Sequence, residues 1–148
     1  MREGRRLAFD YGDVRIGVAQ SDRSGILASP LVTVLAQSAS LSKELREIIE
    51  ESDPIYLVLG LPKNLSGAGS AKVESVRNFA QLLREVTDLP IYFVDERLTT
   101  VSAARSLKAA GRNTRDARLE IDMAAAVSIL ESALNSERLQ GHPSQDQF

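Results

Sequence analysis

The chain has 148 residues, of which 43% are hydrophobic and 26% are charged, with a formal net charge of -2 and no cysteine. This size and composition fit one domain with a buried hydrophobic core. The lack of cysteine excludes a disulfide framework, a thiolate zinc site and a cysteine nucleophile. One histidine, His142, lies in a polar stretch, so a histidine-based triad is not favoured either.

The sequence shows no apolar stretch long enough to span a membrane, and its start, MREGRRLAFD, does not resemble a secretory signal. We therefore expect a cytoplasmic protein with no membrane partner. The pI near 5.5 argues against nucleic-acid binding through the global charge, but it allows a local basic patch.

The N-terminal part of the chain predicts three strands joined by short turns. The first strand is expected over residues 6–10, around the apolar run from Leu7 to Phe9; the second, over 14–21, follows the turn YGD, and the third, over 25–34, contains Pro30. Short connections of this kind predict an antiparallel meander. Proline cannot donate to a β-ladder, so the third strand is expected at a sheet edge.

The rest of the chain predicts alternating helices and strands. The pattern predicts a helix from Leu41, a strand over 55–60, a helix over 73–83, a strand over 91–96 and helices over 101–107 and 119–136. Right-handed crossovers make the fourth and fifth strands parallel to the first. The expected fold is α/β, with a five-stranded mixed sheet flanked by helices. We expect one domain over 1–137 and a flexible polar tail over 138–148.

Acidic residues end two of the predicted strands. Asp10 ends the first strand, and Asp95 and Glu96 end the fifth. The carboxyl ends of parallel strands share the sheet edge where sites form in such folds. Adjacent strand residues point to opposite faces, so only one of Asp95 and Glu96 should face a shared site, and periodicity does not choose between them. Turn chemistry explains Asp10 equally well when it is taken alone.

Asp122 lies within the apolar face of the last predicted helix. It shares a stripe with Ala125, Ala126, Ile129 and Ala133. A carboxylate there needs compensation, which a salt bridge or the helix N-terminus can supply. Alternatively, Asp122 joins the other acids in a site of hard oxygen ligands, which suits Mg²⁺ or Mn²⁺. Two such ions can activate water and stabilise the leaving oxygen in phosphodiester cleavage.

A basic segment lies in sequence between Glu96 and Asp122. Its cationic residues are Arg105, Lys108, Arg112, Arg115 and Arg118. A solvated face explains any one of them, whereas the cluster predicts contacts to phosphate. The N-terminal arginines Arg2, Arg5 and Arg6 form either a second basic patch or merely a soluble terminus.

The loop GLPKNLSGAGS, over 60–70, leads from the fourth strand into a helix. It lacks the Gly-Lys-Ser/Thr ending of a P-loop, so Walker-type ATP binding is rejected. Lys63 and Asn64 are candidate contacts to a substrate backbone, and an ordinary loop is the other interpretation.

Four ordered blocks resemble the YqgF family: FDYGDVRIGVAQSD, GLPKNLSGAGS, VDERLTT and EIDMAAAVSIL. YqgF proteins are named as nucleases of precursor 16S rRNA or as Holliday-junction resolvases, with an RNase H-like fold. The resemblance implies Asp10, Glu96 and Asp122 as catalytic residues and metal ligands, and thereby selects Glu96 over Asp95. Arg97 also matches the family. Ser66 departs from it, since many relatives have Asp there.

The resemblance implies a metal-dependent nuclease acting on structured nucleic acid, with a site for two Mg²⁺ or Mn²⁺ ions. We favour processing of the 5′ end of precursor 16S rRNA in ribosome biogenesis. A Holliday-junction resolvase for recombination and repair needs two coordinated sites and hence a dimer, and no dimer surface is visible in the sequence. A non-catalytic nucleic-acid-binding module is the third hypothesis, and the intact acids count against it. The expected partner is precursor rRNA or branched DNA, bound by a monomer or homodimer.

Overall fold

The computed structural model of the protein describes residues 1–62, 70–96 and 114–148, and for Ser70 and residues 114–122 it describes the backbone alone. The elements are β1 (Leu7–Tyr11), β2 (Arg15–Ser21), β3 (Ala28–Leu35), α1 (Leu41–Ser52), β4 (Leu57–Leu61), α2 (Ser70–Val86), β5 (Ile91–Asp95), α4 (Thr114–Gln140) and β6 (Asp146–Gln147). The helix predicted over 101–107 lies outside the described residues.

One six-stranded sheet organises the fold, with the strand order β3-β2-β1-β4-β5-β6. The first three strands form the predicted antiparallel meander, and β4 and β5 run parallel to β1. β3, which contains Pro30, lies at an edge as predicted. The mixed α/β architecture is therefore confirmed.

The predicted count of five strands was too low. The C-terminal residues return to the sheet as β6, which pairs Gln147 with Tyr92 and Asp146 with Phe93. The ring of Phe148 packs edge-on against Phe93, with 5.8 Å between the centroids. The stretch expected as a flexible polar tail thus has hydrogen-bonded and aromatic partners, and α4 continues past the expected boundary at residue 137.

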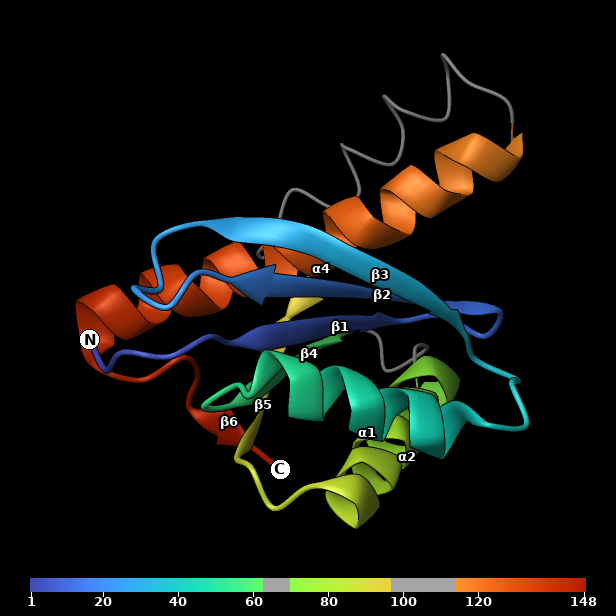
Figure 1. The fold of residues 1–148 in the computed structure, drawn as a ribbon, viewed down its shortest axis with the longest axis horizontal. Helices are drawn as coiled ribbons and strands as arrows, with labels where there is room; N and C mark the ends of the chain where they lie inside the picture. Colours follow the sequence, from blue (N-terminus) through green and yellow to red (C-terminus); the bar gives the residue numbers. More distant parts are fainter. Residues whose placement is uncertain (63–69, 97–113) are drawn as a thin grey trace.

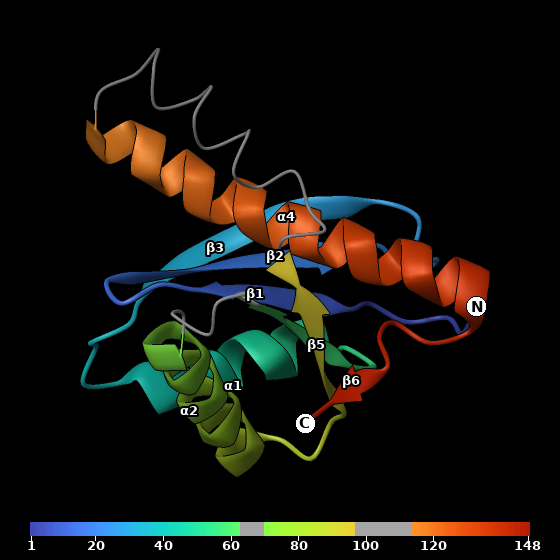
Figure 2. The same cartoon turned by 180° about the vertical axis from the view of Figure 1, so that it is seen from behind.

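The sheet separates two hydrophobic layers. α1 and α2 cover one face, and α4 runs across the other (Figures 1 and 2). Strand alternation divides β1 between them, since Leu7 and Phe9 belong to the α1–α2 layer and Ala8 to the α4 layer. β4 is buried at every residue, as expected for a strand covered on both faces. In the described part of the chain, no helix has both the length and the apolar character needed to cross a membrane.

Candidate active site

Asp10 lies near the carboxyl end of β1 and is almost fully buried, with 4% of its surface exposed. Ala8 packs in the α4 layer, so the two-residue alternation places Asp10 on that same face of the sheet. Its partner on β2 is Gly17, and Gly60 of β4 directly follows Leu59, the partner of Phe9. The neighbouring strands therefore place residues without a Cβ beside this carboxylate.

Glu96 directly follows β5 and is partly exposed. Tyr92 and Val94 belong to the α4 layer, which places Asp95 on the opposite face and Glu96 on the α4 face. A distance supports this placement, because an ideal Cβ added to Gly60 would lie 3.5 Å from Glu96 Oε1. The structure thus settles the ambiguity of the sequence pattern, since Glu96 shares the α4 face with Asp10 and Asp95 does not.

The direction of α4 places its earlier turns toward the acids. Near the C-terminal end of α4, Glu137 contacts Arg6, which precedes β1, and Tyr56, which precedes β4. Further back along the helix, Ile129 packs at Gly60, within the last part of β4. α4 therefore runs antiparallel to β1 and β4, and its N-terminal turns lie toward the carboxyl ends of these strands.

Asp122 occupies the predicted stripe of α4, although its side chain lies outside the described residues. The stripe itself is confirmed as the face packed on the sheet, because its four apolar members are buried: Ala125, Ala126, Ile129 and Ala133. Position 122 precedes Ile129 by two helical turns, or about 10 Å along the axis. The backbone at position 122 therefore lies beyond Ile129 in the direction of the carboxyl ends of β1 and β4.

Two of the three predicted acids therefore share one face at one edge of the sheet. Carboxylate oxygens are the ligands that Mg²⁺ and Mn²⁺ prefer, so the donor set fits a hard divalent cation. Among the described side chains, no group of three or more histidine, cysteine or acidic residues forms a metal site. Asp122, the third predicted ligand, is not among those side chains.

The family profile of RuvX, described as a Holliday junction resolvase, matches residues 4–136. The chain belongs to the RuvX family. Two relatives, from Streptomyces avermitilis and Streptomyces coelicolor, are named as candidate pre-16S rRNA nucleases. The first is 48% identical and the alignment covers 95% of this chain and 92% of the relative. The second is 46% identical, with coverage of 97% and 87%.

A solved structure extends the comparison to the fold. It is T. thermophilus RuvC in complex with a Holliday junction substrate, with a TM-score of 0.61, 13% identity, and coverage of 98% of this chain and 99% of that one. At this identity the match shows the fold alone. RuvX and YqgF are two names for one family, so the resemblance found in the sequence is confirmed. The RNase H-like fold predicted from the sequence is confirmed as well, and the RuvX chain belongs among nucleases.

The predicted nucleic-acid contacts of this RuvX chain cannot be placed in the structure. Lys63, Asn64, Arg97, Arg105, Lys108 and Arg112 lie outside the described residues, and for Arg115 and Arg118 only the helical backbone of α4 is described. These residues remain predictions of the sequence.

Lys72, in the first turn of α2, is a further cation at this edge and belongs to none of the motifs described above. Its Nζ donates a hydrogen bond of 2.6 Å to the carbonyl oxygen of Tyr11 and lies 5.4 Å from the centroid of the Tyr11 ring. Tyr11 directly follows Asp10, so Lys72 brings a positive charge to the end of β1. The sequence feature that could have identified Lys72 is its position just after the loop that follows β4.

A buried polar cluster occupies the opposite end of the central strands. Arg6 is fully buried, and its Nη2 donates to Glu137 Oε2 at 2.9 Å. The Tyr56 hydroxyl donates to Glu137 Oε1 at 2.7 Å. Burial raises the pKa of Tyr56, and the hydrogen bond to Glu137 raises it further, so Tyr56 stays protonated. Neither sequence interpretation of Arg6, as surface patch or soluble terminus, is correct.

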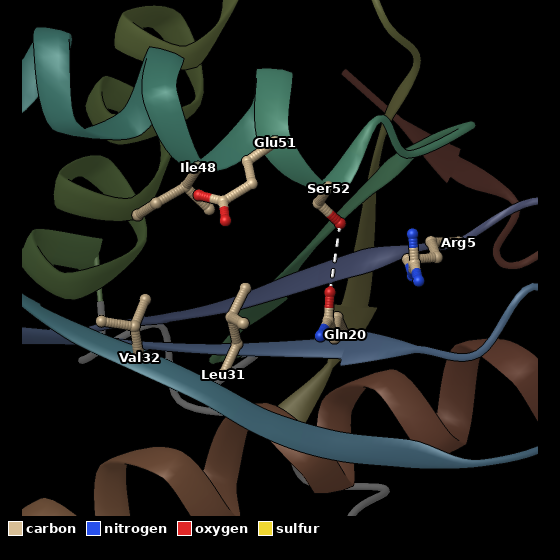
Figure 3. Close-up of a pocket in the computed structure, with 7 residues that line it drawn as sticks. All are labelled: Arg5, Gln20, Leu31, Val32, Ile48, Glu51 and Ser52. Carbon is tan, nitrogen blue, oxygen red and sulfur yellow. Dashed lines mark hydrogen bonds between the residues drawn. The ribbon is translucent and has the colours of Figure 1, made fainter.

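A cavity of 340 Å³ lies between α1 and the meander, on the face away from α4 (Figure 3). It is lined by Arg5, Gln20, Leu31, Val32, Ile48, Glu51 and Ser52. The Ser52 hydroxyl donates to Gln20 Oε1 at 3.3 Å within it. Because the predicted acids lie on the α4 face, this cavity is separate from the candidate active site.

Proposed function

We propose that this RuvX-family protein is a cytoplasmic, metal-dependent nuclease that processes the 5′ end of precursor 16S rRNA. The observation that carries the proposal is the placement of Asp10 and Glu96 on the α4 face, at the carboxyl edge of the sheet. The names of the Streptomyces relatives, at 46% and 48% identity, point to precursor rRNA as the substrate.

Asp10, Glu96 and Asp122 are the proposed catalytic residues and would hold Mg²⁺ or Mn²⁺, in a site for two ions. When bound, such ions supply Lewis-acid stabilisation of charge on phosphate oxygens. The protein itself orients the donors. Burial of Asp10 restricts its carboxylate, and Gly60 lets α4 approach β4 beside Glu96.

Substrate binding is assigned to basic residues and to Asn64. Lys72 lies at this edge of the sheet, where it contacts Tyr11. The further proposed contacts are Lys63, Asn64, Arg97, Arg105, Lys108, Arg112, Arg115 and Arg118. A local cluster of this kind supplies the attraction for phosphate that a net charge of -2 does not.

A Holliday-junction resolvase is the second candidate function. The family description names that activity, and the fold is shared with a RuvC structure solved on a junction. Resolution of a four-way junction needs two coordinated cuts, so this function requires a homodimer. The ribosomal function can be performed by a monomer.

A cleavage assay that offers precursor 16S rRNA and a four-way DNA junction side by side tests the proposal. Each substrate is incubated with Mn²⁺, with Mg²⁺ and with chelator. We expect metal-dependent cleavage of the rRNA and an intact junction. Cleavage of the junction alone would favour the resolvase, and no cleavage of either substrate would favour a non-catalytic module. Asp10→Asn, purified in parallel, controls for contaminating nuclease.

A further inference from the structure

A hollow of 420 Å³ lies at the end of the central strands opposite to Asp10. It forms where the N-terminus of the chain lies beside the C-terminal end of α4, an arrangement seen in both ribbon views (Figures 1 and 2). Arg2, Arg138 and His142 line it together with Tyr56 and Tyr92. Its volume falls within the range of roughly 300–1,000 Å³ that is typical of small-molecule sites.

The charge of the hollow is positive. Arg2 and Arg138 contribute two cations, and Glu137 is the acidic residue among the described residues that line it. The carboxylate of Glu137 accepts hydrogen bonds from buried Arg6 and from the Tyr56 hydroxyl. Its negative charge is therefore compensated inside the protein, and the two exposed arginines attract an anion.

Tyr92 offers an aromatic surface in the same hollow. Its ring is partly exposed and stands edge-on to buried Tyr56, with 5.5 Å between the centroids and 79° between the planes. Pairing of Tyr92 with Gln147 of β6 fixes its backbone. Aromatic rings beside arginines bind nucleotides, because the ring stacks on the base while the cation contacts the phosphate.

The side chain of Arg138 and the backbone of Arg2 are anchored to the fold. Arg138 Nη1 donates to the carbonyl oxygen of Gly25 at 3.1 Å. The backbone carbonyl of Arg2 accepts a hydrogen bond of 2.8 Å from Nη2 of buried Arg6. The contact to Gly25 reduces the entropy that the Arg138 side chain loses when a ligand binds.

We propose that this hollow binds a nucleoside phosphate, with the base against Tyr92 and the phosphate between Arg2 and Arg138. Residue 138 lies about 24 Å along the axis of α4 from position 122. The occupant we infer is a nucleotide of the RNA substrate at a distance from the cut, so that the hollow helps to select the bond that is presented. This assignment of the occupant rests on the proposed nuclease function.

Binding of a short single-stranded RNA, measured by fluorescence anisotropy in chelator, tests the site without cleavage. We expect Arg2→Ala/Arg138→Ala to weaken affinity and to lower the salt slope by roughly one to two units. Tyr92→Val should weaken affinity about five- to a hundredfold, the range for removal of one base–aromatic stack, whereas Tyr92→Phe should keep it. Lys43→Ala/Arg46→Ala on α1 is the control for charge removal and should bind like wild type.

Calorimetry with AMP and with inorganic phosphate separates the contact to the base from the contact to the phosphate. AMP should bind wild type and lose affinity in Tyr92→Val, whereas inorganic phosphate should respond only to the arginine variants. Unchanged RNA and AMP affinity in all variants would overturn the site. Loss of AMP binding with unchanged RNA binding would overturn the RNA occupant, and loss in the arginine variants alone would overturn the base contact.

Two further variants keep these outcomes interpretable. Arg2 is exposed, so Arg2→Ala alone tests the phosphate contact in a folded protein if the double variant does not fold. Asp10→Asn should retain binding in the hollow. The nuclease proposal is contradicted if Asp10→Asn cleaves RNA at the wild-type rate. The proposed nucleotide site is contradicted if the Arg2 and Tyr92 variants bind RNA and AMP like wild type, so the two outcomes are distinct.

Discussion

The two ends of the central strands use charge in opposite ways. At the amino end, Arg6 and Glu137 form a buried ion pair that Tyr56 completes. At the carboxyl end, Asp10 and Glu96 bring like charges to one face of the sheet. A buried pair of opposite charges is costly to break, whereas neighbouring carboxylates favour a cation between them. Charge thus stabilises the fold at one end, and at the other end it forms the proposed cation site.

The largest expected effect is loss of cleavage at the carboxyl end. Asp10→Asn, Glu96→Gln and Asp122→Asn should each lower the rate about a thousandfold or more, which corresponds to ~4 kcal/mol of activation free energy. Each change removes one carboxylate of the proposed metal site. Single-turnover kinetics on precursor 16S rRNA, with folding checked by circular dichroism, measures the effect. Asp95→Asn, on the other face, is the control, and full activity of any acid variant would exclude that residue from the mechanism.

Mutations at the amino end of the central strands should change the stability of the fold. Glu137→Ala leaves the buried charge of Arg6 without its partner, so we expect the free energy of unfolding to fall by about 3–5 kcal/mol. Glu131→Ala, an exposed position of the same helix, should change it by less than about 0.5 kcal/mol. Urea unfolding of both variants measures the difference. Equal midpoints would show that the ion pair contributes nothing.

Tyr56→Phe should have a smaller effect that depends on pH. It removes a hydrogen bond to a charged group, worth about 1.5–3 kcal/mol. In wild type the raised pKa of Tyr56 adds stability below the unfolded value of about 10, and this contribution is lost as the pH rises further. The variant should therefore lose less stability than wild type above that pH. Thermal melts at a series of alkaline pH values measure this difference. A parallel decline of the melting temperature in wild type and variant would contradict the prediction.

Gly60→Ala tests the close approach of α4 to β4 beside Glu96. The added Cβ would lie 2.5 Å from Ile129 Cδ1, so we expect overpacking to cost about 1–3 kcal/mol and to reduce cleavage. Ile129→Val removes the clashing atom and should restore part of both losses in the double variant. A double variant no better than Gly60→Ala would place the defect elsewhere.

The smallest expected effect is on the salt dependence of substrate binding. Arg112→Ala/Arg115→Ala should lower the salt slope by roughly one unit for each phosphate that is no longer neutralised. Binding to unrelated RNA sequences should weaken equally. Titrations at several salt concentrations measure the slope, and an unchanged slope would identify both residues as a solvated surface.

The sequence predicts the carboxyl end better than the amino end. Local sequence patterns predict the strands, the parallel crossovers and the position of Asp10, because each of these features depends on residues that are close in the sequence. The partners Arg6 and Glu137 lie 131 residues apart, and no local pattern links them. The sequence therefore gives no signal that Arg6 is buried, and an arginine near the terminus is expected at the surface.

Two other features of the structure could not be predicted from local sequence patterns. β6 has two residues within a polar stretch, so its pairing with β5 leaves no periodic signal. Alternation predicts that Asp95 and Glu96 point to opposite faces, but the face of each depends on where α4 packs. In the structure, Val94 packs in the α4 layer, and Gly60 lies close to both Ile129 of α4 and Glu96.

Binding of Mn²⁺, measured by isothermal titration calorimetry, tests most directly whether the acids on the α4 face form a cation site. Wild type and Asp95→Asn should bind Mn²⁺ with equal affinity. Asp10→Asn and Glu96→Gln should each bind at least about tenfold more weakly. Wild-type affinity in Asp10→Asn and Glu96→Gln, with a loss in Asp95→Asn, would contradict the account.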